Sequence, residues 1–421
     1  MSNHKSMPKD KGLDHTLSVL REGYEFILNR SNKYDSNIFE TKVLGEKTIC
    51  LTGKEAAELF YDNAKFMRSG AAPKHVQKTL FGENGVQALD GEEHQHRKAM
   101  FMALMTSDAL NEIAELTKKH LEAFAAQWET QEKIIVYEEA KKILTHVACE
   151  WTGVPLEDEE VDERTNQLAD MFESAASIGP EYWKGRRSRN AGEEWMEELI
   201  QKVRDGEMNP PSHRALKQFS NHRDLNGELL DKQIVAVELL NLLRPIVAIS
   251  VYMSFTVLAM IEYPDQVLSL KSGNETDRQN FIQEVRRYYP FFPFAGARVK
   301  EDFTWEGYKF EEGTLTLLDL YGTNHHPDLW DDPKKFNPAR FESWQGSPFD
   351  FIPQGGGEFD FGHRCAGEWL TLDVLKETLS YFVTGLTFEV PEQDLSYRMS
   401  EMPSLPKSGV QLSNLVRQKN G

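Results

Sequence analysis

A cysteine near the end of the chain stands in a context that favours its ionised form. Cys365 follows a run of three glycines, Gly355 to Gly357, and precedes an amphipathic segment that we predict to be helical from about Ala366. The positive end of a helix dipole, exposed backbone N–H groups and the neighbouring Arg364 would all favour a thiolate here. A thiolate is the group that an axial iron ligand requires. The alternative is a small buried cysteine that does no chemistry.

A second candidate is Arg244, which is followed by Pro245 inside the most apolar part of the chain. The planar guanidinium of an arginine that points into apolar surroundings can grip a carboxylate through two parallel hydrogen bonds. The alternative is a structural arginine paired with an internal acid such as Glu238. Taken alone, the residues leave both interpretations open.

These residues need elements that position them. The segment from about Asp231 to Met260 predicts a helix of about 30 residues, about 45 Å long, which is apolar all round in its second half and should cross the middle of the molecule. Pro245 predicts a local distortion in it. Helical periodicity also marks Ala109 to Trp128.

Short β-segments accompany the helices. Ser36 to Thr52 reads as a hairpin that turns at LGEK, and Glu301 to Asp319 reads as further short strands with glycine turns. The predicted fold class is therefore mainly α with small β-sheets.

Composition excludes several functions. The 421 residues carry 67 acidic against 48 basic side chains, a net charge of −19, which argues against nucleic-acid binding. The polar first residues show no signal peptide or membrane anchor, and the uncharged run from Pro245 to Ile261 suits a buried core helix better than a transmembrane segment. No linker is apparent, so we expect one domain over residues 1–421.

The three cysteines, Cys50, Cys149 and Cys365, lie far apart and form no metal-binding pair. This spacing fits a reducing cytoplasm. The histidines His96, His325 and His326 show no metal-ligand spacing, and we interpret them as structural.

Three motifs in order resemble those of one family. Gly362 to Gly367 resembles the cysteine loop of the cytochrome P450 superfamily. Glu284 and Arg287 fit its E-x-x-R motif, whose spacing places both on one helix face, and the FNPARF segment supplies a third member, Arg340. The loop departs from the usual pattern, because Glu358 stands where a phenylalanine is expected and a short insertion follows. The resemblance implies a P450 fold around one haem b (iron protoporphyrin IX), with Cys365 as iron ligand and a structural Glu–Arg–Arg group behind it.

Arg244 and Pro245 also resemble one branch of that superfamily, since they replace the acid–alcohol pair of ordinary members. The branch is the bacterial fatty-acid peroxygenases, and the likeness extends from KGLDHTLSVLREGYEF to MPSLPKSGV. It implies oxidation of long-chain fatty acids by hydrogen peroxide without a dedicated reductase. The carboxylate held by Arg244 would take the place of the missing acid–base group.

The resemblance assigns further residues. Phe81 and Gln87 would lie near the haem edge. Three basic residues, Arg68, His94 and Lys98, would lie near the haem propionates. For His94 and Lys98 the alternative is a solvated helix face. The pocket would also be shaped by Phe291, Phe292, Phe294 and Ala295. A glutamine at position 87, where decarboxylating relatives have histidine, cannot shuttle a proton as imidazole can. It favours hydroxylation at the α and β carbons, with decarboxylation as a second outcome.

Three other functions remain open from sequence. The chain could be mainly a decarboxylase that forms 1-alkenes, or a monooxygenase that needs a reductase. It could also be a haem-binding fatty-acid carrier or sensor without turnover.

Overall fold

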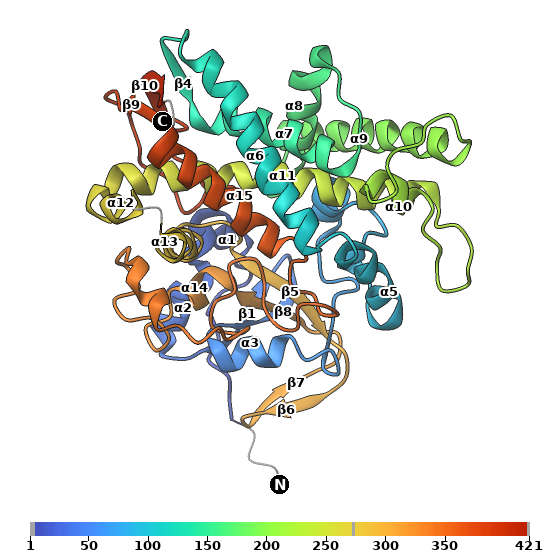
Figure 1. Ribbon diagram of the computed structural model, residues 1–421. Coiled ribbons are helices and arrows are strands. Elements are labelled where there is room, and N and C mark those ends of the chain that lie inside the picture. Colours follow the sequence, from blue (N-terminus) through green and yellow to red (C-terminus); the bar gives the residue numbers. More distant parts are fainter. Residues whose placement is uncertain (1–4, 272–273, 419–421) are drawn as a thin grey trace.

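The computed structural model describes residues 5–271 and 274–418 and is mainly helical, as predicted (Figure 1). The helices are α1 Thr16–Glu22, α2 Phe26–Tyr34, α3 Lys54–Phe60, α4 Lys74–Val76, α5 Gly91–Met102, α6 Ser107–Trp128, α7 Val136–Thr152, α8 Val161–Glu173, α9 Pro180–Arg204, α10 Ala215–Ser220, α11 Lys232–Glu262, α12 Pro264–Leu270, α13 Glu275–Tyr288, α14 Leu320–Asn324 and α15 Glu368–Ser380.

The strands form small sheets. They are β1 Ile38–Val43, β2 Glu46–Leu51, β3 Phe66–Met67, β4 Lys133–Ile135, β5 Phe294–Val299, β6 Phe303–Trp305, β7 Tyr308–Phe310, β8 Leu315–Asp319, β9 Leu386–Glu389 and β10 Gln411–Arg417. The sheet orders are β1-β2-β8-β5-β3, β4-β10-β9 and β6-β7. In Figure 1 the five-stranded sheet lies on one side of α11, and helices α6 to α9 gather on the other.

Helix α11 is the central element. It continues unbroken through Pro245 and packs against α7, α9 and α15. It is long and apolar enough to cross a membrane by length and composition, but 89% of its most apolar window is buried inside the protein. The helix therefore forms core, which is the interpretation that its sequence favours.

The predicted hairpin is present. β1 and β2 pair antiparallel, with Val43 opposite Glu46, so the turn consists of Leu44 and Gly45. Both turn residues have positive φ, 52° and 77°, as a two-residue type I′ turn requires. β2 also pairs in parallel with β8. This pairing joins the hairpin to the strands predicted within residues 301–319.

Strand β8 ends in a fully buried acid, Asp319. Its Oδ1 accepts a hydrogen bond of 2.6 Å from the Gly322 N–H, at the start of α14, whereas Oδ2 has no partner. Burial raises the pKa of Asp319 to about 8. The carboxyl is therefore protonated in the folded chain at neutral pH.

We expect Asp319→Asn to stabilise the protein increasingly as pH rises. The folded state of the wild type keeps a proton that the unfolded state loses near pH 4, so wild-type stability falls between about pH 4 and pH 8, by at most about 1.4 kcal/mol per pH unit. The asparagine can still accept from Gly322 and cannot ionise. Free energies of unfolding of both proteins, measured in urea from pH 5 to pH 8, check this. The exposed Asp328→Asn is the control, and a variant-to-wild-type difference that does not change with pH contradicts the expectation.

Candidate active site

Cys365 lies in the loop that leads into α15. The helix begins at Glu368, two residues later than expected, and the Cys365 N–H donates to the Gln354 carbonyl at 3.4 Å. Burial raises the pKa of the Cys365 thiol, while Lys98, the Gly367 N–H and Arg286 act in the opposite direction.

Arg364, which is expected to favour the Cys365 thiolate, has an acid partner in α15. Its Nε donates to Glu368 Oε2 at 2.6 Å, and Arg286 Nη2 donates to the same carboxylate, so the effect of Arg364 on Cys365 stays a prediction. Burial opposes ionisation of this thiol, whereas a bound metal ion favours the thiolate, because metal ligation requires the deprotonated sulfur.

The E-x-x-R pair is buried and forms a group of three. Arg287 Nε and Nη2 donate to the two carboxylate oxygens of Glu284 at 2.7 and 2.8 Å. Arg340 Nε lies 3.1 Å from Glu284 Oε2. Neither Glu284 nor Arg287 has exposed surface, so the pair does not belong to a solvated helix face.

The three predicted propionate residues are buried. Arg68 Nη1 has no hydrogen-bond partner, and burial lowers the pKa of Arg68 to about 10. The ring of His94 lies against that of His363, with centroids 3.8 Å apart and a tilt of 30°, and burial lowers the pKa of His94 to about 4. Lys98 Nζ donates to the Arg364 carbonyl. With exposures of 4% and 5%, His94 and Lys98 are not part of a solvated face.

These residues fit haem. A buried cation with an unused donor, Arg68, and a neutral imidazole, His94, are suited to hold carboxylates such as propionates. Cys365 supplies the sulfur that an iron ligand requires. Lys98 donates to the Arg364 carbonyl and so contacts the peptide that precedes Cys365. An ammonium has three donors, so its predicted place beside the propionates stays a prediction.

Arg244 is buried on α11 with an exposure of 5%. Its Nη2 donates to Asn241 Oδ1 at 3.3 Å, its Nε has no partner, and it forms no ion pair within residues 5–271 and 274–418. Burial lowers the pKa of Arg244 to about 9, and the Arg189 charge acts in the same direction. The guanidinium therefore remains charged at neutral pH. Cys365 acts on this pKa in the opposite direction, so the two groups influence each other electrostatically.

Glu238 is not the partner of Arg244. Its Oε1 accepts from Arg97 Nη1 and from the Val86 N–H, each at 2.8 Å, and its Oε2 accepts from Asn241 Nδ2 at 3.0 Å. The acid is thus occupied by other donors. The alternative of a structural Arg244–Glu238 pair is excluded.

Asn241 is a site residue that the sequence prediction missed. It accepts from Arg244 and donates to both Glu238 and Gln87 Oε1, the latter at 3.3 Å. Pro245 has no N–H to donate to the Asn241 carbonyl, four residues before it. A signal was available: Asn241 is a polar residue in an apolar helix, three positions before Arg244 and so on the same face.

Only some of the other predicted pocket residues lie together. Phe291 stacks on Tyr252 of α11 with ring centroids 4.2 Å apart, and Phe81 packs against the same large core cluster. Phe292 is 37% exposed. Phe294 and Ala295 lie on β5 and pack against two other clusters. Of this group, Phe291 and Phe81 are therefore the two that share a core with Arg244's helix.

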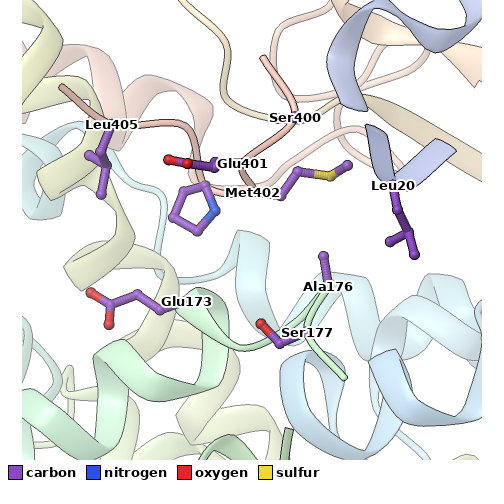
Figure 2. A pocket seen from close by; sticks show the side chains of 9 residues that line it. Leu20, Glu173, Ala176, Ser177, Ser400, Glu401, Met402 and Leu405 are labelled. Carbon is purple, nitrogen blue, oxygen red and sulfur yellow. The ribbon is translucent and has the colours of Figure 1, made fainter. Parts of the chain in front are cut away.

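A hollow of about 390 Å³ opens elsewhere, between α1, the end of α8 with the following loop, and segment 400–405. Figure 2 shows Glu173 and Ser177 on one wall and Glu401 and Met402 on the other. None of the predicted site residues lines it. The candidate site is therefore defined by its side chains around Cys365 and Arg244 and not by this hollow.

Known proteins resemble the chain over most of its length. Residues 278–413 match the family described as cytochrome P450. Cytochrome P450EX alpha (CYP152N1), solved with myristic acid, is 52% identical, with a TM-score of 0.95 over 98% of this chain and 100% of that one. Cytochrome P450SP alpha (CYP152B1), solved with (R)-ibuprophen, is 42% identical, with a TM-score of 0.94 over 96% and 99%.

A variant of cytochrome P450 OleT in complex with arachidonic acid is 39% identical, with a TM-score of 0.96 over 99% of this chain and 100% of that one. Beta-amyrin 6-beta-monooxygenase of Solanum lycopersicum is 23% identical over 90% of this chain and 86% of that protein. The likeness to P450EX alpha, P450SP alpha and OleT covers at least 96% of this chain, including the part that carries Arg244. The chain therefore belongs to the cytochrome P450 family and, within it, to the CYP152 branch.

Proposed function

We propose that the chain uses hydrogen peroxide to oxidise long-chain fatty acids, mainly by hydroxylation at the α and β carbons, with decarboxylation to terminal alkenes as a second outcome. The observation that carries the proposal is the buried, charged and largely unpaired guanidinium of Arg244. Relatives solved with myristic acid and with arachidonic acid support this class of substrate.

Membership of the cytochrome P450 family makes the chain an oxidoreductase that carries haem. We propose haem b, bound by one domain over residues 1–421, with no dedicated reductase and a cytoplasmic location. When bound, haem supplies an iron centre at which peroxide is activated, with electron density donated by the thiolate. Arg68, His94 and Lys98 would hold its propionates and Cys365 its iron.

Arg244 binds the acid end of the substrate. A guanidinium has five N–H donors, and one of them is in use, toward Asn241. A carboxylate can accept two of the others in parallel. Because this charge is buried, the pairing also removes the cost of an uncompensated ion. Fixing the carboxylate on α11 makes the α and β carbons the part of the alkyl chain whose position is best determined.

The substrate carboxylate also serves as the acid–base group. The acid of α11 that precedes Arg244 most closely is Glu238, and both of its oxygens are taken by internal donors. A bound fatty-acid carboxylate beside Arg244 can accept and return a proton of peroxide, which is general acid–base catalysis by the substrate itself. This arrangement couples the reaction to the presence of an acid substrate.

Gln87 bears on the product. Its side-chain oxygen accepts from Asn241, so the amide is oriented by the residue that also contacts Arg244. An amide donates and accepts hydrogen bonds but does not titrate. The residue therefore favours hydroxylation, which ends with the carboxylate intact, over proton-coupled loss of carbon dioxide.

We expect the haem-loaded protein to convert C12–C18 acids with peroxide alone, and Arg244→Leu to reduce kcat/KM by about 100-fold, the range for loss of one partner of a buried charge pair. Gas chromatography of the products measures both. Arg398→Leu, at an exposed arginine, is the control and should change little. Product that forms only when a reductase is supplied indicates the conventional monooxygenase, and lipid binding without any turnover indicates a carrier; either result overturns the proposal.

We expect Gln87→His to raise the ratio of terminal alkene to hydroxy acid, because an imidazole beside the substrate acid can transfer a proton. The same product analysis gives the ratio. Gln87→Asn retains a neutral amide and is the matched control. An unchanged ratio in Gln87→His would show that pocket shape, and not this side chain, selects the product. A wild-type ratio that already favours alkene would identify the chain as mainly a decarboxylase.

We expect Asn241→Leu to raise the Kd for fatty acid about 10-fold, since Arg244 and Gln87 both lose a hydrogen bond that orients them. Asn241→Asp should weaken binding further, because an acid at this position would pair with Arg244 and compete with the substrate. Spectral titration with a saturated fatty acid measures both, and the exposed Asn226→Leu is the control. Equal affinities in Asn241→Asp and the wild type contradict this role.

A further inference from the structure

Gln354 contacts Cys365 through both its backbone and its side chain. Its carbonyl accepts from the Cys365 N–H at 3.4 Å, and its side-chain Nε2 lies 3.9 Å from Cys365 Sγ, within hydrogen-bonding range for sulfur. It directly precedes the three glycines of the loop. The residue therefore lies beside the atom that ligates iron.

Two neighbours fix which way the amide of Gln354 points. Thr371 Oγ1 donates its proton to the Gly367 carbonyl at 2.9 Å, so toward Gln354 it can only accept, and it does so from Nε2 at 3.0 Å. On the other side Arg286 Nη2 donates to Gln354 Oε1 at 3.0 Å. A guanidinium has no acceptor. Both contacts require the same orientation, with the NH₂ group toward Thr371 and Cys365.

The amide group has two hydrogens, and Thr371 takes one of them. The second is the one available to Cys365 Sγ. A flipped amide would set its NH₂ against Arg286 and its oxygen against the sulfur, so it would lose the bond from Arg286 and the contact with Cys365. It would also have to draw the Thr371 proton away from the Gly367 carbonyl. The donor is thus assigned by the network and not by the distance to sulfur alone.

The network that holds Gln354 is rigid. Arg286 is buried and also donates to Glu368 Oε1 at 2.7 Å and to Gln283 Oε1. Glu368 in turn holds Arg364. These contacts join α13 to the start of α15 behind the cysteine loop, so the amide has little freedom to move away from Cys365.

We propose that Gln354 donates a side-chain hydrogen bond to the thiolate of Cys365 when that thiolate ligates iron, and that it thereby limits the electron density that the sulfur gives to the metal. Hydrogen bonds to a ligating sulfur raise the reduction potential of the metal, because they withdraw charge from the sulfur. Gln354 is a positioning residue: it acts through Cys365. The proposal rests on the haem ligand and not on the substrate or the oxidant.

The test is Gln354→Leu in the haem-loaded protein, read by the reduction potential of the iron and by the C–O stretching frequency of the reduced carbon monoxide complex. Without the donor, the sulfur gives more charge, so the potential should shift to more negative values and the C–O frequency should fall. Gln283→Leu is the matched control, since it removes a different partner of Arg286 and leaves Cys365 untouched. It should leave both readouts as in the wild type.

A second variant keeps the test decisive if Gln354→Leu does not take up haem. Gln354→Glu retains the length of the side chain and the acceptor for Arg286, but sets a carboxylate oxygen toward the sulfur. Its potential should be more negative than that of the wild type. A potential and a C–O frequency equal to the wild-type values, in either haem-loaded variant, overturn the proposal. Neither readout needs fatty acid or peroxide, so a failure of the proposed function would not affect them.

Discussion

The structure depends on keeping one guanidinium charged inside an apolar helix. Arg244 is buried, keeps its charge at neutral pH, and uses a single described hydrogen bond, to Asn241. An uncompensated buried ion costs several kcal/mol. The fold carries this cost in the ligand-free state, and a carboxylate that reaches the arginine removes it. The proposed affinity for acids would therefore draw on a cost that the folded α11 already carries.

The two sides of the haem site are organised in opposite ways. Near the cysteine, the polar groups form a connected network, in which, of the buried side-chain atoms, only Arg286 Nε lacks a partner among the described residues: Arg364 pairs with Glu368, Glu368 with Arg286, and Arg286 with Gln354. On α11, Arg244 has one hydrogen-bond partner and an unpaired Nε within the described part of the chain. A connected network restrains the loop that it contacts, whereas free donors leave a position at which an acid can bind. The cysteine loop is thus braced by ion pairs, and Arg244 keeps donors free.

Sequence reasoning predicted the elements and the residues whose partners are close along the chain. The central helix, the hairpin and the pairing of Glu284 with Arg287 follow from periodicity and spacing. It did not foresee the ion pair of Arg364 with Glu368, although the two residues lie one helical turn apart along the chain. The role of Gln354 beside Cys365 could not be predicted from sequence, because it depends on contacts with Arg286 and Thr371 that form only in the folded chain. Asn241 could have been found, since it lies on the Arg244 face of the same helix.

Helix α5 joins these two sides through neighbouring residues. Arg97 donates to Glu238, which accepts from Asn241, the partner of Arg244, and Lys98 donates to the carbonyl of Arg364, the residue before Cys365. Consecutive positions on a helix point about 100° apart, so one short element reaches both networks. A displacement of α5 would therefore alter the contacts around Arg244 and the cysteine loop together.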